Sequence, residues 1–317
     1  MHSRAFGMGV AAIVTVCAVL FYLTGNSLPL AGDKGLALPS ANEWFGYQPL
    51  SFAASILVNG AIVFIMLLLN KVYNVFRSIS SLNIALFAAM QLATPDLLTQ
   101  FYTGTMLALI VPLCLLLLFN CYRAPTQTRH IFLIFLLLSF FTATQYCYGL
   151  YAIAFMLGIG QMRIFNARSI IAALLGIITP WWIMIGFRFI SVSDIAIPSF
   201  VSVFSVIDHS DTLLLLTTMG LTAFAMILCF SLNLLKTIAY NARARAINGS
   251  FTVISLLTIV CACADYRNIV SYIPMLNFCA SMEITHYFST HRGEKSFIPV
   301  LILLASYAVI FACQIAI

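Results

Sequence analysis

Charged residues are scarce in this sequence of 317 residues: Asp, Glu, Lys and Arg together make up only 8% of it, whereas 62% of the residues are hydrophobic. Soluble domains average about 25% charged and roughly 45–50% apolar residues. No water-soluble core could bury so much apolar surface, and the mean hydropathy of +1.05 indicates that a bilayer is the solvent for most of the chain. The composition therefore excludes an ordinary soluble protein.

Long polar stretches are missing as well. The longest interval between apolar runs covers about residues 26–48, which is too short for a soluble domain. The sequence contains no phosphate-binding loop, nucleophile elbow or zinc-protease motif. We therefore expect residues 1–317 to form a single all-α integral membrane domain, and we favour a non-enzymatic function over catalysis.

Most of the nine cysteines fall within apolar runs. We interpret them as small hydrophobic residues and not as a disulfide framework. Cys261 and Cys263 are two residues apart, which places them on different faces of a helix. No metal or other cofactor is expected from this pattern.

Apolar runs predict about eleven membrane segments, since a helix that spans the hydrocarbon core needs about 20 mostly apolar residues. The first follows Arg4 and lacks a convincing small-residue cleavage site, so we expect an uncleaved helix and not a signal peptide. The eleven segments cover residues 8–25, 49–69, 79–93, 99–120, 131–146, 148–161, 169–189, 212–235, 249–264, 268–288 and 297–316.

Residues 131–161 could form one long helix or a hairpin of two short ones. Basic residues precede this stretch at Arg123 and Arg129 and follow it at Arg163 and Arg168. A single crossing would place these clusters on opposite sides of the membrane, which the positive-inside rule disfavours. We therefore predict a hairpin, with a turn around Gln145–Gly149 that lies below the outer surface and is covered by protein.

The basic residues then predict an orientation with the N-terminus in the cytoplasm and the C-terminus in the periplasm of a bacterial inner membrane. Outside lie Lys34, Arg188 and Arg267, whereas the other twelve of the 15 Lys and Arg residues lie inside. Those twelve are Arg4, Lys71, Arg77, Arg123, Arg129, Arg163, Arg168, Lys236, Arg243, Arg245, Arg292 and Lys295. We expect this basic face to contact the bilayer and its anionic lipids. It does not indicate nucleic acid, and no protein partner is indicated.

Several short motifs occur in a characteristic order. Arg163-Ile-Phe-Asn-Ala-Arg168 is followed by an apolar run and by Gly176-Ile-Ile-Thr-Pro180. Later come Tyr272-Ile-Pro274, a helix, a basic turn with Arg292 and Lys295, and a final helix. In this order the chain resembles, over nearly its whole length, an uncharacterised family of polytopic inner-membrane proteins from Bacteroidota, known as a domain of unknown function. The resemblance implies a bacterial inner membrane and supplies no activity.

Charged side chains within membrane segments are the best indicators of a functional site, because each costs roughly 2.5–3.5 kcal/mol at a helix centre. Glu283 and His286 are three residues apart and so share one face of the tenth segment. Such a pair could relay protons or contact a substrate, or it could be a structural hydrogen-bonded pair near the lipid headgroups. A di-iron site would need further carboxylates and a second Glu-x-x-His motif, so no metal is expected.

A second candidate site lies at the outer ends of the helices. Arg188 ends the seventh segment, and Asp265 and Arg267 form a tight outer turn. Together with Asp194, Asp208 and Asp211 they could bind a substrate outside the membrane. The alternative is structural: Arg188 could reach lipid phosphate and Asp265 could pair with Arg267.

Three functions remain open. The first is a transporter or flippase for an envelope precursor or another amphipathic substrate, which predicts a cavity lined by Arg188, Glu283 or His286. The second is a periplasm-facing glycosyltransferase that uses a lipid-linked sugar, in which Asp33 or Glu43 acts as general base. The third is a non-catalytic subunit or scaffold of an envelope complex, which predicts apolar faces and no cavity.

Overall fold

The computed structural model describes residues 4–25, 35–76, 81–191, 193, 195, 200, 213–238, 240–290 and 297–316. Over these residues the secondary structure is helical, with no strand. Two short 3-10 helices, η1 and η5, cover Ala41–Glu43 and Tyr266–Asn268. The α-helices are α1 (Arg4–Leu23), α2 (Gln48–Tyr73), α3 (Leu82–Leu92), α4 (Pro95–Leu98), α5 (Thr103–Asn120), α6 (Thr128–Thr142), α7 (Cys147–Gln161), α8 (Ala167–Gly186), α9 (Leu213–Ile238), α10 (Ala242–Ala264), α11 (Ile269–Thr290) and α12 (Phe297–Ala316).

Each predicted apolar segment overlaps one of these helices, and α4 is an additional single turn. That all eleven lie in the membrane stays a prediction. Within the described ranges, seven helices are long and apolar enough to cross a membrane: α1, α2, α5, α8, α9, α10 and α12. The helices α3, α6 and α7 are apolar but shorter. Helix α11 has 22 residues and carries several polar side chains. The chain is therefore an all-helical multi-pass membrane protein.

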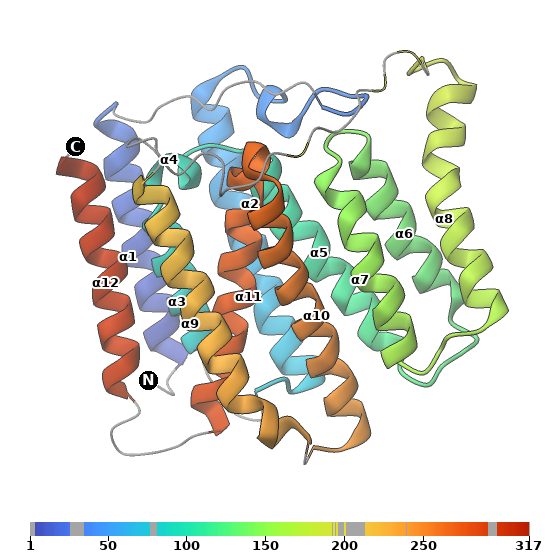
Figure 1. Cartoon of the computed structure of the whole chain (residues 1–317). Helices are drawn as coiled ribbons and strands as arrows, with labels where there is room; N and C mark the ends of the chain where they lie inside the picture. The colour runs from blue at the N-terminus through green and yellow to red at the C-terminus, as the bar shows by residue number, and fades with distance from the viewer. Residues whose placement is uncertain are drawn as a thin grey trace.

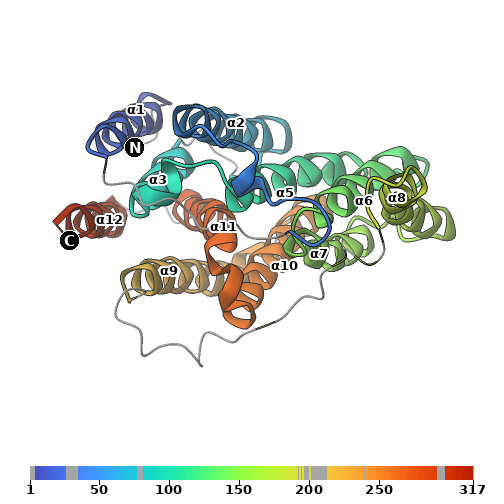
Figure 2. The same ribbon diagram turned by 90° about the horizontal axis from the view of Figure 1, so that it is seen from above.

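The central helix of the bundle is α11. It packs against α3, α5, α9 and α10, which surround it when the molecule is seen from above (Figure 2). Its side chains between Ser271 and His286 are buried, including those of Asn277 and Glu283. The polar residues of α11 thus face other helices and not lipid. Polar groups in a membrane interior need such protein partners, because no water is present there to hydrogen-bond them.

A polar face of α2 stabilises the break after α3. Ser51, Ser55 and Asn59 are spaced four residues apart and share one side of the helix. The hydroxyl oxygen of Ser51 accepts a hydrogen bond of 2.9 Å from the backbone N–H of Phe101, and the Ser55 hydroxyl donates one of 2.8 Å to the carbonyl of Leu98. Backbone groups that the helix break leaves unpaired are thereby satisfied within the membrane region.

Three amides link α2, α3 and α11. The side-chain NH₂ of Gln91 donates to Oδ1 of Asn59 at 3.0 Å, and the NH₂ of Asn277 donates to Oε1 of Gln91 at 3.0 Å. Because lipid offers no partner, such groups are stable only when neighbouring helices satisfy them. The network therefore ties the short helix α3 to its longer neighbours.

Residues 131–161 form two helices, α6 and α7, that turn between Ala143 and Tyr146 (Figure 1). The carbonyl of Ala143 accepts hydrogen bonds from the backbone N–H groups of Ala37 and Leu38, at 2.9 and 2.8 Å. The segment before α2 thus covers the turn. A helical hairpin with a protein-covered turn is therefore present, as the charge pattern predicts. Its turn comes earlier than the predicted Gln145–Gly149, because α7 already begins at Cys147.

Helices α6 and α8 approach each other closely at Gly176. A Cβ atom at this position would lie 2.6 Å from the carbonyl oxygen of Phe132 and 2.9 Å from Cβ of Phe135, both on α6. The hydroxyl of Ser139 donates a hydrogen bond of 2.7 Å to the carbonyl of Ile177. Only glycine fits this contact, which holds the peripheral helix α8 against the bundle (Figure 2).

Candidate functional site

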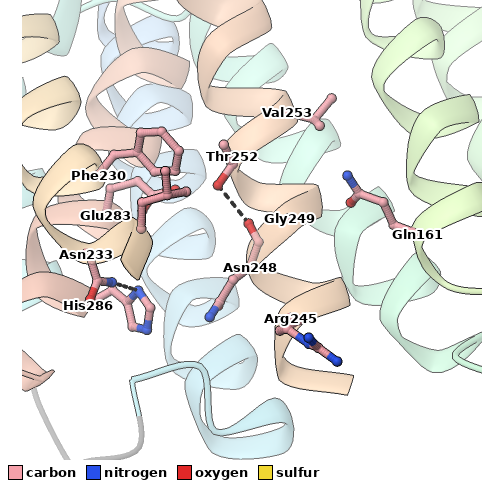
Figure 3. Close-up of a pocket in the computed structure, with 11 residues that line it drawn as sticks. Gln161, Phe230, Asn233, Arg245, Asn248, Gly249, Thr252, Val253, Glu283 and His286 are labelled. Carbon is pink, nitrogen blue, oxygen red and sulfur yellow. Dashed lines mark hydrogen bonds between the residues drawn. The ribbon is translucent and has the colours of Figure 1, made fainter. Parts of the chain in front are cut away.

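The structure brings Glu283 and His286 into one cavity. Both side chains are buried, with Glu283 only 7% exposed, and they lie one turn apart on α11. The cavity has a volume of about 290 Å³ and lies between α7, α9, α10 and α11 (Figure 3). Its size is at the lower end of the roughly 300–1,000 Å³ that is typical of small-molecule pockets.

The cavity lies near the end of the bundle where α10 begins and α11 ends (Figure 1). Arg245, near the start of α10, is exposed and belongs to the cavity wall, so the cavity reaches the protein surface. Phe230, Leu234 and Val253 make the wall partly apolar. The polar lining residues are Gln161, Asn233, Arg245, Asn248, Thr252, Glu283 and His286.

Hydrogen bonds from α9 and α11 orient the His286 ring. The side-chain NH₂ of Asn233 contacts Nδ1 of His286 at 2.6 Å, and the hydroxyl of Thr290 donates to Oδ1 of Asn233 at 3.1 Å. Because an amide NH₂ can only donate, Nδ1 is the acceptor, and the neutral ring carries its proton on Nε2. The fixed ring thus presents a defined tautomer at the cavity.

Glu283 is the buried acid of the site. Among the described residues, no side chain or backbone group donates a hydrogen bond to its carboxylate and no cation forms an ion pair with it. The carboxylate also borders a second, smaller space of about 10 Å³, which it shares with Phe230 and Thr252. An ionised carboxylate in such surroundings lacks compensation for its lost hydration.

On the opposite wall, Gln161 joins the end of α7 to α10. Its Oε1 accepts a hydrogen bond of 2.9 Å from the hydroxyl of Ser250. The same side chain lies over Gly249, where an added Cβ would be 3.1 Å from Oε1. Glycine therefore permits α7 to approach α10 and lets an amide line the cavity (Figure 3).

Few potential metal ligands lie among the described residues beside the cavity. Over the residues that the structure describes, no three His, Cys, Asp or Glu side chains are close enough together to hold a metal ion. Glu283 and His286 alone provide too few ligands for a di-iron centre. What they offer is a buried carboxylate and an oriented imidazole in a partly apolar space.

Asp265 lies in a different place from Glu283, at the opposite end of α10. Its side chain is 0% exposed. Its Oδ2 accepts hydrogen bonds from the hydroxyls of Tyr146 at 2.7 Å and Tyr272 at 3.0 Å, and from the Asn268 amide at 3.2 Å. These donors satisfy the carboxylate and connect the α6–α7 turn to the α10–α11 turn, so Asp265 is enclosed by protein.

The other predicted site residues do not join the cavity. Arg188 and Arg267 are exposed, at the end of α8 and in η5. Glu43 is exposed in η1 and lines neither of the two spaces beside Glu283. Asp33, Asp194, Asp208 and Asp211 lie outside the described residues.

Sequence reasoning missed Asn233 and Gln161 as lining residues. Each is a single amide within a long apolar helix, and such a residue carries a modest signal by itself. The charge pattern assigns Arg245 only to the basic cytoplasmic face. A polar residue near the end of an apolar helix can indicate a lining residue of a cavity. The identity of its partners, however, depends on packing between segments that are distant in the sequence.

Comparison of the chain with protein-family models, with curated proteins and with solved structures found no match. The case for a function therefore depends on the geometry of the site.

Proposed function

We propose that this protein is a multi-pass transporter or flippase for an amphipathic substrate, such as an envelope precursor, in a bacterial inner membrane. The observation that supports it is the cavity, in which the buried carboxylate of Glu283 faces open space between α7, α9, α10 and α11. A scaffold has no need of such a space, and an unpartnered acid in a membrane bundle usually marks a substrate or ion pathway.

The proposal assigns the cavity to the cytoplasmic side. Arg243 and Arg245 begin α10 beside it, and Lys236 lies near the end of α9 at the same end of the bundle. The positive-inside rule places such clusters in the cytoplasm. The start of α1 and the end of α12 lie at opposite ends of the bundle, which agrees with an N-in, C-out topology (Figure 1).

This orientation can be tested in intact cells with a membrane-impermeant maleimide. Tyr47, before α2, is 69% exposed and Phe165, between α7 and α8, is 62% exposed. Tyr47→Cys should be labelled from outside, whereas Phe165→Cys should be labelled only after lysis. For both variants, the labelling of the native cysteines in the wild-type protein is subtracted as background. The reverse pattern would contradict the assigned orientation.

The transport proposal is tested by lipid and glycolipid mass spectrometry of a deletion strain. We expect an amphipathic precursor to accumulate, and we expect wild-type protein and Glu43→Gln, but not Glu283→Gln, to restore the parental profile. Glu283 is the only acid among the described residues that line the cavity. Loss of its carboxylate should therefore reduce the flux of substrate by about tenfold or more, which corresponds to a lost interaction of roughly 1.4 kcal/mol.

An unchanged lipid profile in the deletion strain would contradict transport of an envelope precursor and favour the scaffold. If Glu43→Gln failed to restore the profile while Glu283→Gln succeeded, the glycosyltransferase alternative would replace transport. Equal protein levels in the membrane, measured by immunoblot, are required for every variant.

A further inference from the structure

We propose that the cavity binds an amphipathic amine, with the ammonium group at the Glu283 carboxylate and the apolar body between α9 and α10. This inference rests on the proposed function, since it names the substrate class of the same site. Three observations carry it: the charge at the site, its lack of a partner and the chemistry of the walls.

The charge selects a cation. Glu283 is buried, faces the cavity and has no hydrogen-bond donor or ion-pair partner among the described residues. Arg245 is the other formally charged residue in the described wall, and its guanidinium points away from Glu283 (Figure 3). A ligand ammonium group would supply the charge-assisted hydrogen bond that the protein leaves open.

While it is neutral, the imidazole of His286 supplies no positive charge to pair with Glu283. Its Nδ1 is engaged by Asn233, which draws the ring toward α9 (Figure 3). Thr252 directs its hydroxyl to the carbonyl of Asn248 at 3.0 Å, within α10. Nδ1 of His286 and the hydroxyl of Thr252 are thus engaged by groups other than the Glu283 carboxylate.

The walls beyond Glu283 indicate an apolar body. Apart from Glu283, the smaller space on that side is bordered by the hydroxyl residues Thr252 and Ser255 and by five apolar residues, Met226, Ile227, Phe230, Leu256 and Ile259. Ile227 of α9 and Leu256 of α10 are also exposed on the outer, lipid-facing surface of the bundle. This smaller space has only about 10 Å³, so α9 and α10 would have to separate for an alkyl chain to pass between them toward lipid. In the larger cavity an alkyl chain can pack against Phe230, Leu234 and Val253, so the site suits a molecule that is cationic at one end and apolar at the other.

The experiment measures binding to the purified full-length protein in lipid nanodiscs by calorimetry, with empty nanodiscs subtracted. The probes are hexylammonium, hexanol and hexanoate, which share a chain length and differ in charge. We expect hexylammonium to bind about tenfold more tightly than hexanol and hexanoate to bind most weakly. In the butyl-to-hexyl series, affinity should rise by up to about fourfold per methylene.

Glu283→Gln should abolish the preference for hexylammonium over hexanol, whereas Glu43→Gln, a change at an exposed acid, should retain it. Equal affinity of the wild-type protein for hexylammonium and hexanol would overturn the inference without any variant, even if Glu283→Gln did not fold. Undiminished preference in folded Glu283→Gln would also overturn it.

The two proposals fail separately. A deletion strain with an unchanged lipid profile would overturn envelope-precursor transport, while the amine preference could still be measured on the purified protein. Conversely, a precursor that accumulates together with no amine preference would overturn the substrate class alone.

Discussion

Replacing Asp265 with alanine is expected to lower the free energy of unfolding by about 3 kcal/mol or more. The substitution leaves the hydroxyls of Tyr146 and Tyr272 and the amide of Asn268 without their shared acceptor. Each buried donor that loses its partner costs roughly 1–3 kcal/mol. Detergent titration of the purified protein, followed by circular dichroism, measures the change.

The matched control is Glu43→Ala, because Glu43 is an acid at the same end of the bundle and is exposed. A surface substitution of this kind changes stability by about 0.5 kcal/mol or less. Similar stabilities of the two variants would show that the carboxylate of Asp265 does not hold the two turns together.

A Gly176→Ala variant is expected to be less stable by about 1–3 kcal/mol, the usual cost of overpacking a filled interface. The added Cβ would meet the carbonyl oxygen of Phe132 at 2.6 Å and Cβ of Phe135 at 2.9 Å, so α8 must move away from α6. That movement would also lengthen the hydrogen bond from Ser139 to the carbonyl of Ile177. Thermal unfolding in nanodiscs provides the measurement.

Gly60→Ala is the control for this prediction. Gly60 lies in the middle of α2, and an added Cβ there would have no neighbouring atom within 4 Å among the described residues, apart from the adjacent backbone of its own helix. In an open position alanine favours a helix by up to about 1 kcal/mol over glycine. The two substitutions should therefore have opposite signs, and a stabilised Gly176→Ala protein would show that α6 and α8 are not in close contact.

Helix positions could be predicted from the sequence because lipid imposes a single criterion, a run of apolar residues of sufficient length. The separation of α6 from α7 could be predicted from Arg123, Arg129, Arg163 and Arg168. These basic residues favour the same side of the membrane, which is a constraint on topology and does not depend on packing. The polar face of Ser51, Ser55 and Asn59 on α2 was not predicted. Its spacing is visible in the sequence, but its purpose appears only where α3 breaks beside it.

The site was predictable in part for a similar reason. Glu283 and His286 share a face because three residues is nearly one helical turn, which is a local property. The contributions of Gln161 and Asn233 depend on how α7 and α9 pack against α10 and α11, which no local pattern specifies. The sequence places Asp265 with Arg188 at an outward site, yet the two tyrosines that enclose its carboxylate lie 119 and 7 residues away along the chain.

The short helix α3 has a consequence for biosynthesis. Its eleven residues extend only about 16 Å, roughly half of a hydrocarbon core about 30 Å thick. It therefore depends on its neighbours, and one of them, α11, leaves the ribosome nearly two hundred residues later, bringing the amide of Asn277 that pairs with Gln91. The centre of the bundle is completed only near the end of translation, so a nascent chain that stops before α11 leaves α3 with unsatisfied polar groups for membrane quality control to recognise.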